Sequence, residues 1–444
     1  MVLFILGLLL FSALGRAVDT PLNQTVRKPN FRLFGGNGPY ATHELMGIDP
    51  SVPGGCQVEQ VVMLSRHAGR YPVSFQSSQY ERTIRKIQHM RQLSGPLEFI
   101  KTYQMFMNSS DQGQLTSTGP FNGALQARML GEQFRSKYSS LWYSNSTTKL
   151  NLLASKSDRV IETCELFAKG FFANDTSKFT VVQIPEIGGG VNSLTPEYSC
   201  IHRYDLLSAM FKGQEFLDSS FQHIVDRFKN YTQPLALPLD SNDIVSLMSL
   251  CPFELSTKAR SQFCNLFDDE DWKAFDYYNS LIQYYSFGPN TNASRAAGSV
   301  FTNATLALLK QGPEEMGPLY FNFAHDIDVI AALGSLGLFL PDSDLPTDHT
   351  PIENPFQLGQ LTPMLAHLVF ERISCQNSPT PYIRLLINDA PIPVPKCQSG
   401  PGRTCPISDF ENYVNQHFTS FQDVCGTSPF QKDYFDLFWE YKNK

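Results

Sequence analysis

Three segments of the chain share one pattern, in which a short run of apolar residues precedes a short polar loop and then apolar residues at helical spacing. The runs and loops are VEQVVMLS before RHAGRYP (residues 58–72), NLLAS before KSDR (151–159) and LYFNFA before HD (319–326). Short unbroken apolar runs are typical of strands that are covered on both faces. Because such strands alternate with helices, the pattern predicts an α/β fold.

Two helices can be predicted in more detail. After the second run, five residues lie on one face of a helix with Ser157 as its N-cap: Val160, Cys164, Phe167, Ala168 and Phe171. A further helix is expected within residues 116–138. Its predicted apolar stripe consists of Phe121, Leu125, Leu130, Phe134 and Tyr138.

The middle of the chain, about 195–305, has a different character. Long helical patterns at 205–231 and 268–287 predict a mainly helical insertion. After residue 360, LAHLVFERISC and YIRLLIND have the pattern of strands that return to the sheet. The sequence therefore predicts an α/β domain with a smaller, mainly helical part inserted into it.

Charged side chains follow each of the three apolar runs. Ligands of open α/β sheets bind beyond the carboxyl ends of the strands, so neighbouring strands would bring these side chains together as a cationic cup. The residues are Arg66, His67 and Arg70, then Arg159, then His325 and Asp326.

The chain as a whole is acidic, so a cluster of positive charge would be confined to one place. The chain has 444 residues, 42% of them hydrophobic and 17% charged, with a net charge of −7. An acidic chain lacks the basic footprint of a nucleic-acid-binding protein. An anion would therefore have to bind in a local positive pocket.

Several features predict secretion. Residues 1–17 have the length and apolar character of a signal peptide, which leaves 18–444 as the mature chain. The alternative, an uncleaved membrane anchor, is disfavoured because the stretch is short for a membrane span. Seven Asn-x-Ser/Thr sequons predict N-linked glycans, at Asn23, Asn108, Asn145, Asn174, Asn230, Asn292 and Asn303.

The nine cysteines predict four disulfides and one unpaired thiol in an oxidising compartment. Cys164 is the expected unpaired one, because it lies on the apolar face of its helix. Cys397 and Cys405 bracket a Gly/Pro-rich loop and are expected to close it. Zinc ligation is disfavoured because the chain has no Cys-x-x-Cys pair.

The pattern Arg-His-x-x-Arg-x-Pro carries the strongest chemical signal. Arginine forks match phosphate oxygens, and an imidazole between them can attack phosphorus. Positive neighbours disfavour the imidazolium, so His67 is expected to stay neutral and nucleophilic in mild acid. The alternative is a solvated basic turn.

The dipeptide of His325 and Asp326 is evidence for a site only because it follows an apolar run. In that position Asp326 would act as a general acid. With Asp328 they could instead ligate a metal, but no partner cluster accompanies them. Arg159 alone would be an ordinary surface residue.

Together these motifs resemble the histidine acid phosphatases, and most of all their secreted yeast branch. The resemblance covers about residues 35–440. It rests on RHAGRYP, SDRVIETCELFAKGF and HD, and further on GGNGPY, LTSTGPFNGALQARMLGEQF and NSLTPEYSC. It implies a three-layer α/β/α domain with a smaller helical domain over the pocket.

The resemblance also implies roles for single residues. His67 would become phosphorylated, and Asp326 would donate the proton. The implied phosphate ligands are Arg66, Arg70, Arg159 and His325. The implied disulfides are Cys56–Cys375, Cys200–Cys425, Cys251–Cys264 and Cys397–Cys405.

Three positions depart from the family pattern. Ala68 stands where a glycine usually follows the motif histidine, and Leu153 where many relatives have another arginine. Asp328 differs from the variants associated with phytases, which favours a general acid phosphatase over a phytase.

The sequence therefore predicts a secreted phosphoric monoester hydrolase that uses a phosphohistidine intermediate and needs neither metal nor cofactor. Its optimum would be acidic, and its substrates small phosphate monoesters. A phytase, a metallophosphatase and an inactive phospholigand-binding protein are the alternatives, and a homo-oligomer is left open.

Overall fold

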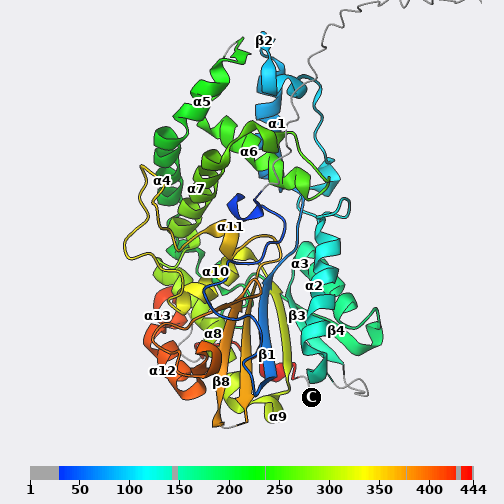
Figure 1. Cartoon of the computed structure of the whole chain (residues 1–444), viewed down its shortest axis with the longest axis vertical. Helices are drawn as coiled ribbons and strands as arrows, with labels where there is room; N and C mark the ends of the chain where they lie inside the picture. The colour runs from blue at the N-terminus through cyan, green and yellow to red at the C-terminus, as the bar shows by residue number, and fades with distance from the viewer. Residues whose placement is uncertain (1–29, 143–148, 236, 377, 427–431, 443–444) are drawn as a thin grey trace, which may run out of the picture.

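The computed structural model describes residues 30–142, 149–235, 237–376, 378–426 and 432–442. The predicted signal segment lies outside these ranges. In Figure 1 a sheet flanked by helices occupies the lower part of the molecule, and a group of helices lies above it.

The sheet is mixed. Its parallel strands, in spatial order, are β1 (Cys56–Arg66), β6 (Leu319–Ala324), β3 (Leu150–Ser155) and β4 (Phe179–Ile184). On the other side of β1 follow the antiparallel strands β7 (His367–Cys375), β8 (Ser378–Ile387) and β10 (Cys405–Pro406), with β9 (Ala390–Ile392) on β8. The three strands predicted to precede the charged loops are thus direct neighbours, and the two predicted returning strands join the same sheet.

Helices cover both faces of the sheet, and alternate residues of β1 show this. Val61 and Met63 belong to the core with α2 (Gly123–Tyr138) and α3 (Asp158–Phe171). Val62 and Leu64 belong to the core that includes α8 (Asn292–Gln311), α10 (Asp326–Ser335) and α12 (Ile407–His417). Because a strand alternates its side chains between faces, β1 is buried on both sides. The expected α/β class and its helix–sheet–helix layers are confirmed.

The helical region draws on two parts of the chain. It contains α4 (Leu206–Ser220), α5 (Gln222–Lys229), α6 (Ser241–Leu255) and α7 (Asp269–Phe287), but also the earlier α1 (Ser74–Gln88), which contacts α6. By contrast, α8 begins inside the predicted insertion range yet packs on α10 beside the sheet. Gly298 permits this close contact, since a Cβ there would collide with the carbonyl oxygen of Ala331.

The remaining elements are short. They are β2 (Gln92–Leu93), β5 (Thr232–Gln233), α9 (Pro313–Met316), α11 (Leu358–Leu361), α13 (Phe421–Cys425), α14 (Leu437–Glu440) and the 3₁₀ turns, among them η6 (Pro196–Ser199).

The helix predicted after Ser157 is confirmed as α3. Ser157 occupies its N-cap position without a side-chain capping bond, and all five residues of the predicted face are buried. The stripe predicted for α2 is partly wrong. Phe121 precedes the helix and Leu125 is 40% exposed, because the face turned to α3 is centred on Ala127, Leu130, Gly131 and Phe134 instead.

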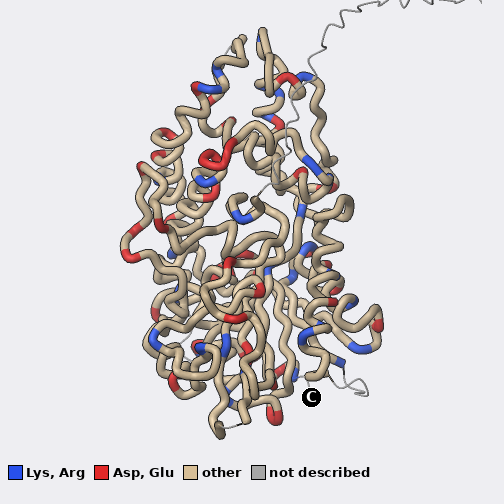
Figure 2. The backbone as a smooth tube through the Cα atoms, viewed as in Figure 1, with Lys and Arg blue, Asp and Glu red and all other residues tan. Residues whose placement is uncertain are grey.

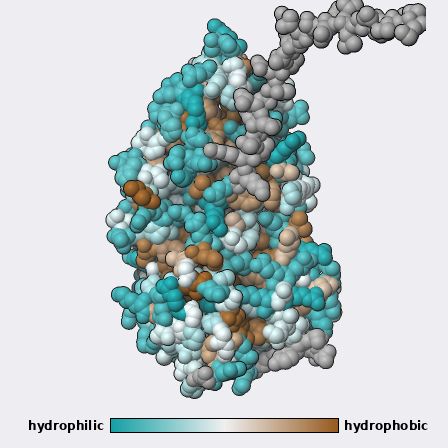
Figure 3. Space-filling model, in the orientation of Figure 1, coloured by the Kyte–Doolittle hydropathy of each residue, from teal (hydrophilic) through white to brown (hydrophobic). Residues whose placement is uncertain are grey.

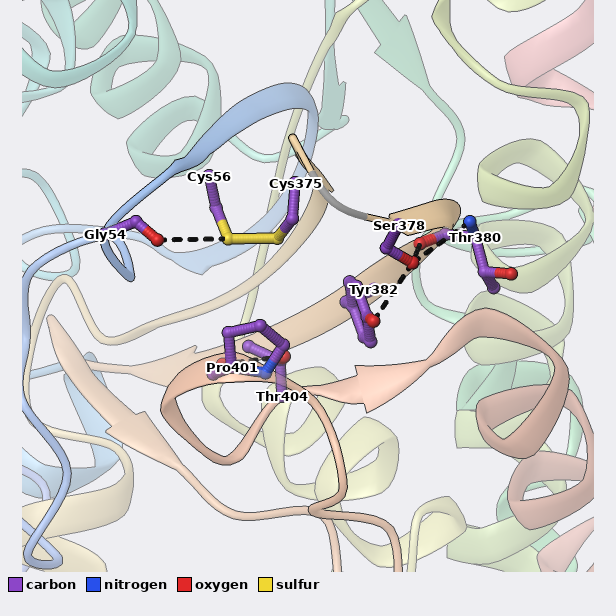
Figure 4. Close-up of a disulfide and its surroundings, with 8 residues drawn as sticks. All are labelled: Gly54, Cys56, Cys375, Ser378, Thr380, Tyr382, Pro401 and Thr404. Carbon is purple, nitrogen blue, oxygen red and sulfur yellow. Dashed lines mark hydrogen bonds between the residues drawn. A yellow bond between two sulfur atoms is a disulfide. The ribbon is translucent and has the colours of Figure 1, made fainter.

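Four disulfides form in the same pairs that the family resemblance implies. Cys56–Cys375 and Cys200–Cys425 join distant parts of the chain, whereas Cys251–Cys264 and Cys397–Cys405 close short loops. Figure 4 shows that the first joins the start of β1 to the end of β7. Cys164 is unpaired and buried, as predicted.

The surface shows no strong segregation of charge or hydropathy. In Figure 2 basic and acidic residues are interspersed along the chain. The face shown in Figure 3 is mostly hydrophilic, with hydrophobic residues in separate small patches. Among the described helices, none has both the length and the apolar character needed to cross a membrane.

Candidate active site

The charged residues predicted from the sequence meet at the carboxyl edge of the parallel strands. Arg66 ends β1 and His67 follows it; Ala324 ends β6, His325 is the N-cap of α10 and Asp326 its first residue. Arg159 lies in the first turn of α3, after β3. Because β1, β6 and β3 are neighbours, residues far apart in sequence share one site.

Arg66 is held rigidly. Its guanidinium donates to the carbonyl oxygens of Gly36 and Thr362, each at 2.5 Å, and pairs with the Asp326 carboxylate at 3.0 Å. Only 2% of Arg66 is exposed. These contacts fix the position of a buried positive charge before any ligand arrives.

The His67 ring has a defined tautomer. Its Nδ1 lies 2.9 Å from the carbonyl oxygen of Ala68, which can only accept, so Nδ1 carries the hydrogen and Nε2 keeps a lone pair. The backbone N–H of Ala68 in turn donates to the hydroxyl of Thr163, on α3. Burial, and then the charges of Arg66 and Arg159, lower the pKa of His67 well below its ordinary value. The imidazole is therefore neutral in mild acid.

Arg70 is held by the motif loop and by the helical region. It donates to the carbonyl of Tyr71 at 3.0 Å and to the side chain of Gln76 at 3.1 Å. Its guanidinium lies 5.7 Å from the ring centre of Phe253 on α6. Burial and the neighbouring arginines lower its pKa to about 10, so it stays charged throughout the acid and neutral range.

The motif loop rests directly on the start of α2. A Cβ at Gly123 would collide with the carbonyl oxygen of Gly69. The small residues at both positions therefore set the distance between the loop and the helix. Ala68, which replaces the usual glycine, is itself completely buried.

Arg159 and His325 lie on the other side of the cup. The Arg159 guanidinium is 3.4 Å from Nδ1 of His325, and Nε2 of His325 donates to the Glu186 carboxylate at 2.6 Å. Glu186 also accepts from Ser155 at 3.1 Å. Arg159 and Glu186 thus orient the His325 ring, whose centre lies 5.6 Å from that of the His67 ring.

Asp326 is the carboxylate that faces the arginines. Burial raises its pKa, but Arg66, His325 and Arg70 outweigh burial, so the net pKa lies below the ordinary value. Beside these cations Asp326 is therefore ionised except at low pH.

Two carboxylates near the site were not predicted from the sequence. Glu186 follows β4, the fourth parallel strand, and Glu197 lies on η6. The segment FTVVQI before Glu186 has strand character, and recognising it would have pointed to the next residues as part of the site. Glu197 lies in NSLTPEYSC, one of the segments that resemble the family, but the resemblance gave this residue no role and only the fold brings it close to the site. Leu153 is buried in the core and lies within β3, away from the strand end.

The cup holds more positive than negative charge. Within the described part of the chain, the Nε atoms of Arg66, Arg70 and Arg159 are buried without hydrogen-bond partners. Several unsatisfied guanidinium donors around one neutral imidazole are suited to a tetrahedral oxyanion. In the same described residues, His, Cys, Asp and Glu form no group of three or more suited to a metal ion.

The fold and this site define a class of α/β protein that presents an imidazole among arginines at the carboxyl edge of its sheet. Residues 57–388 match the family model of the histidine phosphatase superfamily (branch 2). The chain therefore belongs to this family.

Named relatives and solved structures agree with this assignment. The chain is 34% identical to a phytase of Candida albicans, over 98% of this chain and 96% of the relative, and 31% identical to a repressible acid phosphatase of Kluyveromyces lactis, over 90% and 87%. The crystal structure of the phytase from D. castellii superposes with a TM-score of 0.85 at 31% identity, over 93% of this chain and 90% of that one.

Proposed function

We propose that this protein is a secreted acid phosphatase that hydrolyses phosphate monoesters through a phosphohistidine at His67. The observation that carries the proposal is the neutral His67 ring, with Nδ1 bound to a carbonyl and Nε2 free, among three arginines. The acid phosphatases among the relatives support the same activity.

In the first step, the Nε2 lone pair of His67 attacks phosphorus in line with the ester oxygen. Arg66, Arg70 and Arg159 bind the non-bridging oxygens and neutralise charge in the transition state. As the P–O bond breaks, Asp326 gives its proton to the leaving oxygen. His325 lies beside Arg159 on the same side of the cup and contacts the phosphate there, with its ring oriented by Glu186.

In the second step, water attacks the phosphohistidine and transfers a proton to the Asp326 carboxylate. The P–N bond breaks, inorganic phosphate leaves, and both His67 and Asp326 return to their starting states. The residues of this chain account for each proton, so no step calls for a metal.

The acidic optimum follows from Asp326. Its pKa is lowered because the neighbouring cations, Arg66 first, outweigh burial, so few molecules hold the proton at neutral pH. A bound phosphate group compensates these cations and favours the protonated acid. Both acidic conditions and the substrate thus promote the active form, and we expect activity to decline toward alkaline pH.

A phytase is the second candidate function. The relatives include phytases, and a lysine lies close to the motif loop: Lys258 is 5.9 Å from the ring centre of Phe106, which stacks on Tyr71. Such a cation could bind a further phosphate of inositol hexakisphosphate. The ratio of kcat/KM for phytate to that for small monoesters decides between the two.

Secretion and glycosylation belong to the proposal. Disulfides support an oxidising compartment. The side chains of Asn108, Asn174, Asn230 and Asn292 are exposed and therefore accessible to glycosylation. Asn303 is half-buried and its amide donates to the carbonyl of Asp433, so we expect it to stay unmodified. Asn23 and Asn145 lie outside the described residues.

The test combines two leaving groups. Asp326→Asn should spare hydrolysis of an aryl phosphate, whose leaving group needs little protonation, and slow an alkyl phosphate by about 100-fold or more. Equal losses on both would remove Asp326 from the acid role. Absence of any hydrolysis by the wild type at about pH 5 would leave a phospholigand-binding protein, and inhibition by chelators would indicate a metallophosphatase.

A further inference from the structure

Beneath the start of α10 lies a pair of buried carboxyl groups. Glu197 is 2% exposed and Asp328 is 4% exposed, and both line one small cavity, where each carboxyl group interacts with the other. Within the described residues, Oδ1 of Asp328 and both oxygens of Glu197 are buried without a hydrogen-bond partner. Two ionised carboxylates cannot hydrogen-bond to each other, because each can only accept.

Water cannot replace the missing donors. The cavity at this place has a volume of about 10 Å³ and is lined mainly by apolar residues of β1, α8 and α10. That volume is at the lower limit for one water molecule, so solvent cannot satisfy three carboxyl oxygens. A proton on one of the two groups joins Oδ1 of Asp328 to one oxygen of Glu197 without any other change, and leaves one Glu197 oxygen without a donor.

The proton is assigned to Asp328 by its surroundings. Oδ2 of Asp328 accepts the backbone N–H of His325 at 2.8 Å, which leaves Oδ1 to carry the hydrogen toward Glu197. Burial, followed by the charge of Glu197, raises the pKa of Asp328 well above its ordinary value. Burial also raises the pKa of Glu197, to about 7, although the bond from Asp328 opposes this.

The pair connects two rigid parts of the molecule. Asp328 lies in the first turn of α10, two residues after Asp326, and binds the peptide that separates Asp326 from Ala324. Glu197 lies three residues before Cys200, whose disulfide to Cys425 anchors that segment. The pair thus links the start of α10, which carries Asp326, to the turn that the Cys200–Cys425 disulfide anchors.

We propose that Glu197 and Asp328 share a proton and act as positioning residues, which hold His325 and Asp326 in the geometry for proton transfer to the leaving group. The inference rests on the proposed function only for the proton transfer. The shared proton itself is a property of the folded chain.

Other ionisable groups bear on this pair. Those that interact electrostatically with Glu197 or Asp328 are Glu186, Asp326, His325, Tyr198 and Tyr204. The carboxylates among them oppose ionisation of the pair. Because burial raises the pKa of Glu197 to about 7, each group holds a proton in mild acid, and the pair shares a single proton above about pH 7. The contribution of Glu197 to stability is complete below its ordinary pKa of 4.5 and is lost as the pH rises through about 7.

Substitutions of Asp328 test the positioning role. Asp328→Asn keeps the shape, the acceptor for His325 and a donor for Glu197, so kcat for an alkyl phosphate should stay within about threefold of wild type. Asp328→Leu has a similar volume but neither group, and kcat for the alkyl ester should fall at least about tenfold, with a smaller fall for an aryl ester. Equal losses in Asn and Leu variants, or equal losses on both esters, would overturn the proposal.

The shared proton is tested without activity. Glu197→Gln removes the titrating group, so its Tm should fall less than that of wild type between about pH 5 and pH 8. Asp409→Asn, which changes an exposed acid in the first turn of α12, is the matched control and should follow wild type. An unchanged Tm dependence in Glu197→Gln would refute the shared proton, whereas an inactive wild type would refute only the phosphatase assignment.

Discussion

Two groups of buried charges lie on the same sheet and differ in how they are compensated. On β7 and β8, the Glu371 carboxylate is fully buried and bound by Arg384 at 2.6 Å, Lys137 at 3.1 Å and the hydroxyl of Tyr138 at 2.5 Å. Burial raises the pKa of Glu371, but Lys137 and Arg384 outweigh it, and the net pKa is low. The carboxylate is thus compensated by side chains of the chain itself, and among its three partners only Nη2 of Arg384 is buried without a hydrogen-bond partner in the described residues.

The cup at the end of β1 is different. Arg66 and Arg70 interact with the Asp326 carboxylate and Arg159 interacts with Glu186, and each of the three arginines keeps a buried Nε that lacks a partner in the described residues. A buried charge that is not compensated costs free energy, so its presence indicates selection for a ligand and not for stability. The comparison separates a structural charge cluster from a functional one.

The largest effect is expected from His67→Ala. It removes the attacking nitrogen from the centre of the uncompensated group, so kcat should fall by about 10⁴-fold or more and no phosphoprotein should be trapped by acid quenching. The Tm should stay near that of wild type. If acid-stable phosphoprotein still formed in this variant, another residue would be the nucleophile.

A paired experiment tests the comparison directly. Arg159→Met should lower kcat/KM by roughly 10²–10³-fold, since one oxyanion donor is lost, without lowering the Tm, since repulsion among the arginines is relieved. Arg384→Met should leave kcat/KM nearly unchanged but destabilise the fold by about 3–5 kcal/mol, since Glu371 loses its buried partner. Kinetic and thermal measurements on both proteins suffice. If both variants lost stability and neither lost activity, the distinction between the clusters would fail.

A smaller effect is expected at Asp276. This buried carboxyl group accepts hydrogen bonds, unlike the unpartnered atoms of the cup, but within the described residues it has no cationic partner of the kind that Glu371 has. Its Oδ1 accepts the N–H groups of Gly35 at 3.0 Å and Gly359 at 2.9 Å, and burial raises its pKa to about 7. Since the pKa is raised on folding, the stabilisation is complete below 3.8 and is lost as the pH rises through about 7.

Asp276→Asn keeps both hydrogen bonds and cannot ionise. It should match wild type at about pH 4 and be more stable at about pH 8, by up to roughly 4 kcal/mol. Thermal unfolding across this range measures the difference. A parallel pH dependence in the two proteins would show that Asp276 does not titrate on unfolding.

The smallest effect is expected at Cys164. Burial raises the pKa of this thiol well above its ordinary value, which keeps it unreactive among the apolar side chains of α3. Cys164→Ala should cost about 1 kcal/mol or less and leave kcat/KM unchanged, as determined by chemical unfolding and kinetics. Loss of activity would mean that the core behind the cup also positions its arginines.

Much of the fold was predictable because its signals are local. The apolar runs at 58–65, 151–155 and 319–324 formed strands, and the face with Val160, Cys164 and Phe167 was buried. The stripe of α2 failed at Leu125 because the side of a helix that is buried depends on where its neighbour lies. Here the neighbour is α3, which approaches at Gly131 and Gly170.

The sequence by itself determined which residues stand near the ends of the strands, since Arg66, Arg159 and Asp326 each lie within four residues of the end of an apolar run. Only the tertiary structure decided the strand order that joins them and the partners that fix their protonation. Glu186 lies outside the motifs, and Thr163 and Glu197 lie inside motif segments that gave them no predicted role. The physical reason is that a pKa and a hydrogen bond depend on distances of a few ångströms between groups that are far apart in the chain, and only folding sets those distances.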